Sequence, residues 1–203
     1  MRVLASLVAC ALLSASASAA KLTSFTTSQV AAIMQATGAT NVTQGVDGDV
    51  PFVDFEYNKL NYRASLRLCD DGTTNNCEGL LLAIAFEAET ADTLEVVNAF
   101  NAGVPVLTSS RPDAKTLAFS RFIIATGGIE DTNVAANFGL LVAAPEIYAE
   151  FRKSQLVASN GVGGVVLLSQ GAGRAPALRP ARLTNEQWRR VMTVKVPKAT
   201  LRR

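Results

Sequence analysis

The most regular pattern of apolar and polar residues in the chain lies between residues 60 and 87. Two alternating segments flank a seven-residue polar loop, with Cys69 and Cys77 at its ends. If these cysteines face each other across an antiparallel pair, the numbers of opposite residues sum to 146. One face of the ribbon then carries only apolar or aromatic side chains, namely Leu60, Tyr62, Ala64, Leu66, Leu80, Leu82, Ile84 and Phe86.

The cysteine register and the hydrophobic register therefore agree. A shift of one residue would turn the whole apolar set outward, so the sequence predicts a hairpin closed by a Cys69–Cys77 disulfide. Closing so short a loop stabilises the fold by about 2–3 kcal/mol. Two unpaired structural thiols are the alternative interpretation. The opposite face of the ribbon carries Arg63, Ser65 and Arg67.

Capping residues and apolar stripes predict three helices around this hairpin. Their expected limits are 26–38, 92–103 and 131–153. Thr26 and Gln29 form a capping box for the first helix. Asp92 is the expected cap of the second, and Pro145 is expected to kink or restart the third.

Three further segments have the apolar pattern of strands. They cover residues 41–46, 50–57 and 116–126. A tight turn at Asp47-Gly48 joins the first two, whereas residues 104–114, rich in Pro, Ser and Asp, are interpreted as a loop. The predicted fold class is α+β, an antiparallel sheet of about five strands with helices packed on one face.

Residues 1–20 have the three-part pattern of a secretory signal peptide. Arg2 precedes an apolar run, and small residues lead to a cleavage site that ends at Ala19 or Ala20. The run is about half of the roughly 20 residues that a membrane anchor needs. The expected location is therefore periplasmic or secreted, with a lipoprotein processed at Cys10 as the alternative. An export compartment also permits the predicted disulfide.

Charge is distributed unevenly along the chain. Residues 21–153 hold nine basic and 16 acidic side chains, whereas residues 154–203 hold nine basic and one acidic. We therefore expect three parts: a signal peptide at 1–20, an α+β domain at 21–154 and a flexible, basic Gly/Ala/Arg-rich tail at 155–203. Its composition predicts that this tail is mostly disordered.

One short helix is predicted inside the tail, at residues 185–193. A second capping box precedes it, and Trp188 would share a face with neighbouring apolar residues, beside Arg189 and Arg190. Such a basic amphipathic helix can bind a protein groove or an anionic membrane surface. The alternative is an unstructured tail whose tryptophan packs back on the domain.

The sequence offers little catalytic chemistry. It contains no histidine, which removes the usual serine triad and most zinc sites. Acidic and amide side chains in the cysteine loop do not have the spacing of a calcium site; these are Asp70, Asp71, Asn75 and Asn76. Four carboxylates could pair as acid and base but are typical of a solvated strand face; these are Asp54, Glu56, Glu87 and Glu89. We expect no cofactor, no metal and no nucleic-acid partner.

The order of these elements resembles the YbjN family. The likeness covers residues 22–151 and includes an aromatic-Asn pair at Phe100-Asn101, an Arg-Phe pair at Arg121-Phe122, and the turn Gly127-Gly128. The family is described as proposed bacterial sensory-transduction regulators with a fold similar to type III secretion chaperones. The resemblance implies a secretion-chaperone-like fold and supplies no catalytic residues. The signal peptide, the cystine hairpin and the basic tail depart from the family pattern.

These features together predict a non-enzymatic, exported interaction module that is chaperone- or regulator-like. A protein partner or a second copy would meet the free sheet face or edge, with Arg63 and Arg67 beside it, and the tail would contact an anionic surface through Trp188, Arg189 and Arg190. One alternative is a small-ligand sensor with a pocket between the sheet and the helix at 131–153. Another is a hydrolase that uses carboxylates alone.

Overall fold

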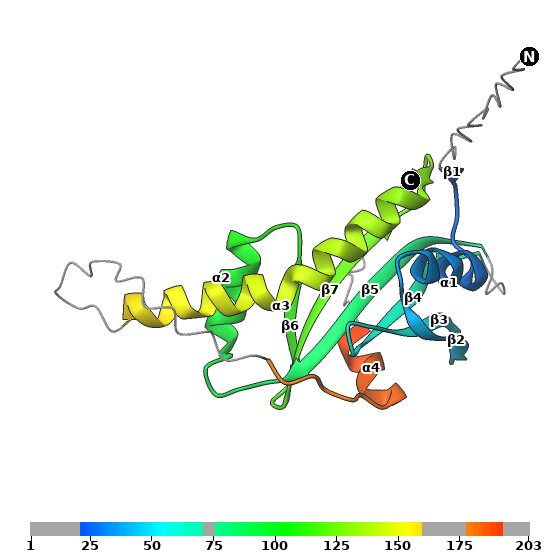
Figure 1. Ribbon diagram of the computed structural model, residues 1–203. Coiled ribbons are helices and arrows are strands. Elements are labelled where there is room, and N and C mark those ends of the chain that lie inside the picture. The colour runs from blue at the N-terminus through cyan, green and yellow to red at the C-terminus, as the bar shows by residue number, and fades with distance from the viewer. Residues whose placement is uncertain (1–20, 71–75, 160–177, 193–203) are drawn as a thin grey trace, which may run out of the picture.

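The computed structural model describes residues 21–70, 76–159 and 178–192, and it confirms the α+β class (Figure 1). In chain order the elements are β1 Lys21–Leu22, α1 Thr27–Ala36, β2 Thr40–Asp47, β3 Val50–Tyr57, β4 Leu60–Cys69, β5 Cys77–Glu87, α2 Leu94–Gly103, β6 Thr108–Asp113, β7 Thr116–Ile124, β8 Ile129–Glu130, α3 Asp131–Ser159 and α4 Asn185–Met192.

The main sheet is antiparallel and has six strands in the order β2-β3-β4-β5-β7-β6. The sixth strand, β6, lies in the segment interpreted as a loop. Asn101 of α2 holds this strand in place, because its amide accepts from Ser109 N at 2.7 Å and donates to Ser109 O at 2.9 Å. Pro112 lies where the register with β7 shifts, as expected for an edge strand that needs no N–H donor there.

The central hairpin has the predicted register. Cys69 lies opposite Cys77, and Tyr62, Ala64 and Leu66 lie opposite their expected partners on β5. The two Sγ atoms are 2.10 Å apart, so the Cys69–Cys77 disulfide is present. The apolar face of this ribbon is buried in the large core, where α3 packs on β5, which explains why the two registers had to agree.

The helix predictions are confirmed in part. The capping box of Thr26 and Gln29 is present at α1. The cap of α2 is Thr93 rather than Asp92, because the Asp92 side chain is fully buried and bonded elsewhere. Helix α3 continues through Pro145 and does not restart there.

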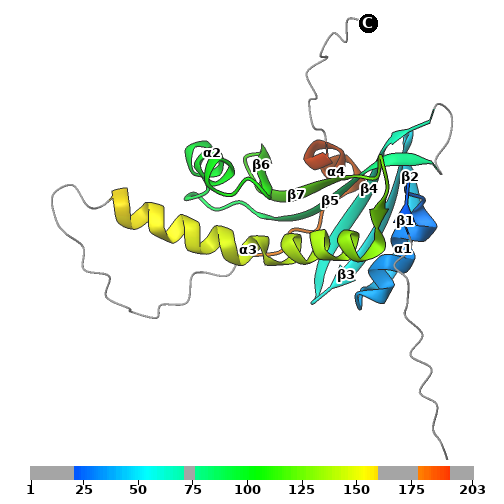
Figure 2. The same ribbon diagram turned by 90° about the horizontal axis from the view of Figure 1, so that it is seen from above.

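Helices cover both faces of the sheet, which corrects the expected one-sided arrangement. Helices α1, α2 and α3 share one large core with the sheet, whereas α4 packs on the opposite face in a smaller apolar cluster. Figure 2 shows α3 and α4 on opposite sides of the strongly twisted sheet. Residues 178–192, predicted to belong to a mostly disordered tail, therefore form part of the folded body. Residues 155–159, also assigned to the tail, continue α3. Residues 160–177 and 193–203, and the signal peptide, lie outside the described residues.

Tyr62 is an unusual member of the large core. Its ring stacks on Phe55 and meets Phe138 edge-on, but its hydroxyl has no hydrogen-bond partner among the described residues. Burial, with a smaller contribution from Tyr57, raises the pKa of Tyr62 to about 12. The hydroxyl therefore bears a desolvation cost that no hydrogen bond offsets.

Replacing Tyr62 with phenylalanine is accordingly expected to stabilise the protein by about 1 kcal/mol, measured by urea unfolding at pH 7. In the parent protein, the folded state holds the Tyr62 phenol proton more tightly than the unfolded chain does. The associated stability is therefore present below pH 10 and falls as the pH rises towards 12. The Tyr62→Phe variant should lose this part of the alkaline dependence.

Tyr148 provides the matched control, because it is equally buried and its hydroxyl donates to Asp92 Oδ1 at 3.1 Å. Tyr148→Phe should therefore destabilise the protein by about 1–3 kcal/mol. If both phenylalanine variants change stability in the same direction, the difference assigned to the two hydroxyl groups is incorrect.

Candidate functional site

Residues 178–192, here called the strap, join the sheet before they form α4. Glu87 N donates to Arg179 O at 2.8 Å, and Ala181 N donates to Ala85 O at 3.1 Å. These two bonds flank a bridge between Pro180 and Phe86 of β5. The strap thus enters beside β5 and is positioned by backbone bonds before its side chains make any contact.

The predicted capping box then starts α4. Gln187 N donates to Thr184 Oγ1 at 3.3 Å, and Thr184 N donates to Gln187 Oε1 at 2.9 Å. Trp188, Val191 and Met192 are buried on one side of the helix, as the sequence predicts. They pack on a patch of mostly small side chains, Leu81, Ala83, Ala85 and Ala118, which allows the helix to approach the sheet closely.

Two arginines of β4 hold the two ends of α4. Arg63 Nη2 donates to Asn185 Oδ1 at 2.9 Å in the first turn, and Arg67 Nη2 donates to the Met192 carbonyl at 3.1 Å in the last. Residues four apart on a strand are separated by about 13 Å, and an eight-residue helix is about 12 Å long. The spacing of the two arginines therefore matches the length of the helix.

Arg63 makes several contacts in addition to its bond with α4. It makes a bidentate bond to Asp54 at 2.6 and 2.7 Å, and its guanidinium lies 3.9 Å from the Phe52 ring centroid and 5.3 Å from that of Trp188. It is only 3% exposed. The prediction that Arg63 lies on an open sheet face is therefore wrong, because the chain's own α4 covers that face.

The other four predicted contact residues also have partners within the chain, and Trp188 is buried in the apolar cluster between α4 and the sheet. Arg67 is half-buried beneath α4, and this burial lowers its pKa. Arg189 Nε donates to both carboxylate oxygens of Asp47 at 2.8 and 2.9 Å, and this bonding lowers the pKa of Asp47. Arg190 pairs with Glu186 along the exposed side of the helix.

The structure adds residues that the sequence did not single out. Asp47 was interpreted only as a turn residue and Asp54 only as one of four solvated carboxylates, yet they are the acidic partners of Arg189 and Arg63. The available signal was the excess of acidic residues in the domain and of basic residues in the tail. The sequence does not show which carboxylate faces which arginine.

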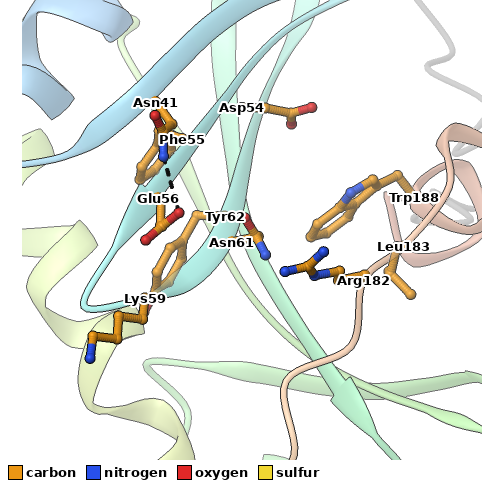
Figure 3. A pocket seen from close by; sticks show the side chains of 10 residues that line it. All are labelled: Asn41, Asp54, Phe55, Glu56, Lys59, Asn61, Tyr62, Arg182, Leu183 and Trp188. Atoms are coloured by element: carbon orange, nitrogen blue, oxygen red, sulfur yellow. Dashed lines mark hydrogen bonds between the residues drawn. The ribbon is translucent and has the colours of Figure 1, made fainter.

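Two hollows lie beside the strap, whereas the sensor alternative placed its pocket between the sheet and α3. The smaller, about 190 Å³, lies under α4 next to Arg63, Arg67 and Arg189. The larger, about 580 Å³, lies between the strap and the strands β2, β3 and β4 (Figure 3). Both hollows thus involve the same docked segment.

The four candidate carboxylates do not gather at one site. Asp54 pairs with Arg63 and Glu89 pairs with Arg152, while Glu56 accepts from the Asn41 amide at 3.1 Å. Within the described residues no group of three or more acidic or cysteine side chains is placed to hold a metal ion. In the cysteine loop Asn76 donates to Asp70, and Asp71 and Asn75 lie outside the described residues.

The fold and the strap define an α+β protein in which one sheet face receives an amphipathic helix. No helix among the described residues has the length and apolar character needed to cross a membrane. No protein-family model matches the sequence, and no curated protein matches it significantly.

Among solved structures the chain is similar to YbjN of E. coli, a proposed transcription regulator. The identity is 10% and the TM-score 0.41, and the alignment covers 68% of this chain and 97% of that one. The likeness is one of fold, and no residue role is transferred from it.

Proposed function

We propose that the protein is a non-enzymatic, exported interaction module whose sheet binds an amphipathic helix of a protein partner. The observation that carries this proposal is the pair of arginines on β4, which holds both ends of a helix on the sheet face opposite α3. In the present state the chain's own α4 occupies that position. The cystine supports export, since such bridges persist in oxidising compartments.

The receiving face does not depend on α4 for its internal bonds. Arg63 remains paired with Asp54 and stacked on Phe52 when the strap leaves, so departure leaves no unpaired charge at this position. The groups of α4 that the two arginines bind are general ones: an amide oxygen in the first turn and a carbonyl in the last. A partner helix of about two turns with a central tryptophan would supply the same groups, and buried tryptophan and arginine often dominate such interfaces.

The full-length chain with Trp188→Ala is therefore expected to bind a fluorescently labelled peptide of residues 178–192. Anisotropy should give a dissociation constant on the order of 100 µM or tighter. The unmodified chain should bind at least about tenfold more weakly, because its tethered strap competes at an effective concentration on the order of mM.

A peptide carrying Trp188→Ala is the matched ligand control and should bind about tenfold more weakly than the parent peptide. A second control is the chain with Arg190→Ala, whose side chain faces away from the sheet and pairs only within α4. That chain should behave like the unmodified one. Equal peptide binding by the unmodified and Trp188→Ala chains, or none by either, would contradict the proposal.

A further inference from the structure

The larger hollow has a polar floor and a mixed wall. Asn41, Glu56 and Asn61 come from three adjacent strands at one level of the sheet. Arg182 and Trp188 belong to the strap and line the other side. Figure 3 shows these two side chains extending towards the hollow, opposite the residues of β3.

Opposite charges face this hollow without meeting. Asp54 is committed to Arg63, and Glu56 has one carboxylate oxygen bonded to Asn41, which leaves its second oxygen available. Arg182 makes no hydrogen bond or ion pair with any described residue, and none joins it to Glu56. A carboxylate on one wall and a guanidinium on the other are thus both available to a bound molecule.

We propose that this hollow binds a small zwitterion, a free α-amino acid with an apolar side chain. Its ammonium group would lie at Glu56, its carboxylate at Arg182 and Asn61, and its side chain against Trp188 and Leu183. The charge of Asp54 is already balanced by Arg63, so a simple anion would meet repulsion from Glu56, and a simple cation would meet repulsion from Arg182. Only a ligand with both charges satisfies both walls, and charge-assisted bonds are the strong ones.

Such a ligand would touch the sheet and the strap at once. It would therefore bind only while the strap is docked and would favour the docked state in proportion to its occupancy. This consequence rests on the proposed function, because a docked strap excludes the partner helix. The amino acid would then act as a regulator of partner binding, which gives the ligand-sensor alternative a site on the face opposite α3.

Calorimetric titration of the full-length protein tests the ligand class with matched probes. L-phenylalanine is expected to bind, and 3-phenylpropionate and 2-phenylethylamine, which each lack one charge, should bind about tenfold more weakly. L-leucine should also bind, since Trp188 and Leu183 offer apolar contacts that are not specific for a ring. Two results overturn the proposal. Either a single-charge analogue binds as tightly as L-phenylalanine, or neither L-phenylalanine nor L-leucine binds at about 10 mM.

Variants then place the site. Glu56→Gln and Arg182→Gln should each weaken L-phenylalanine binding about tenfold. Lys59→Gln is the control, because Lys59 lines the rim but extends away from the strap (Figure 3), and it should leave the affinity within about twofold. An unchanged affinity in both Glu56→Gln and Arg182→Gln overturns the assignment.

The peptide and amino-acid experiments fail independently. If peptide binding is absent but L-phenylalanine binds as described, the proposed function is wrong and the ligand site stands. The docked peptide of residues 178–192 itself supplies Arg182 and Trp188 to the hollow, so L-phenylalanine should strengthen its binding to the Trp188→Ala chain. If peptide binding is found and L-phenylalanine does not strengthen it, the regulatory coupling is wrong.

Discussion

Replacing Asp92 with alanine is expected to lower the free energy of unfolding by about 3–5 kcal/mol, a large effect for one substitution. The Asp92 side chain is fully buried and accepts from Arg152 Nη1 at 2.8 Å, Tyr148 hydroxyl at 3.1 Å and Glu89 N at 2.8 Å. Removing it leaves three donors without their acceptor and a buried guanidinium without its closest counter-charge. Urea unfolding at pH 7 measures the loss.

The same cluster also shifts the pKa of Arg152. Burial by itself would lower the pKa of Arg152, but the hydrogen bond and charge of Asp92, with help from Glu89, raise it above the ordinary value. Because a guanidinium is not deprotonated in proteins, Arg152 remains charged in the Asp92→Ala variant even without that contribution. The double variant Asp92→Ala/Arg152→Met removes the orphaned charge and should recover part of the loss.

An exposed ion pair supplies the control for this prediction. Arg190 and Glu186 pair at 2.7 Å with both side chains more than half exposed. Glu186→Ala should therefore change stability by less than about 0.5 kcal/mol. If Asp92→Ala costs no more than Glu186→Ala, the buried cluster does not stabilise the fold in the way described.

Removing the disulfide with Cys69→Ala/Cys77→Ala is expected to cost about 2–3 kcal/mol. The two cysteines are separated by eight positions, so the bridge restricts the unfolded chain over a short loop. Cys77 is also fully buried and exchanges two backbone bonds with Phe25 at 2.7 and 3.1 Å. The loss should therefore appear as greater sensitivity to urea rather than as a rearranged hairpin.

Reduction of the parent protein with dithiothreitol should lower its stability by the same amount. The double alanine variant should not respond to the reductant. A reductant effect of similar size in the variant would show that the loss does not come from the Cys69–Cys77 bridge.

Sequence reasoning succeeded where the deciding contacts lie close together along the chain. The capping boxes at Thr26 and Thr184 join residues three apart, and the hairpin register follows from alternation on each side of a short loop. The apolar side of α4 also follows from helical spacing. In each case the relevant physics is confined to a few neighbouring residues.

Sequence reasoning failed where a local signal competed with a contact to a residue distant in the chain. Asp92 has the character of a helix cap, but Arg152, 60 positions away, draws it into the core and leaves the cap to Thr93. The segment containing β6 is rich in turn-forming residues, but Asn101 pins Ser109 and β7 supplies the remaining strand bonds. Tertiary contacts override weak local preferences in both places.

The sequence by itself determined the helices that begin with capping boxes, the disulfide-closed hairpin, the α+β class and the amphipathic character of α4. The tertiary structure decided where α4 lies and therefore what Arg63 and Arg67 do. Their contacts with α4 span 122 and 125 positions, and an amphipathic pattern shows that a face must be covered without showing what covers it. Only the folded sheet, with two arginines spaced to the length of one short helix, selects the chain's own strap.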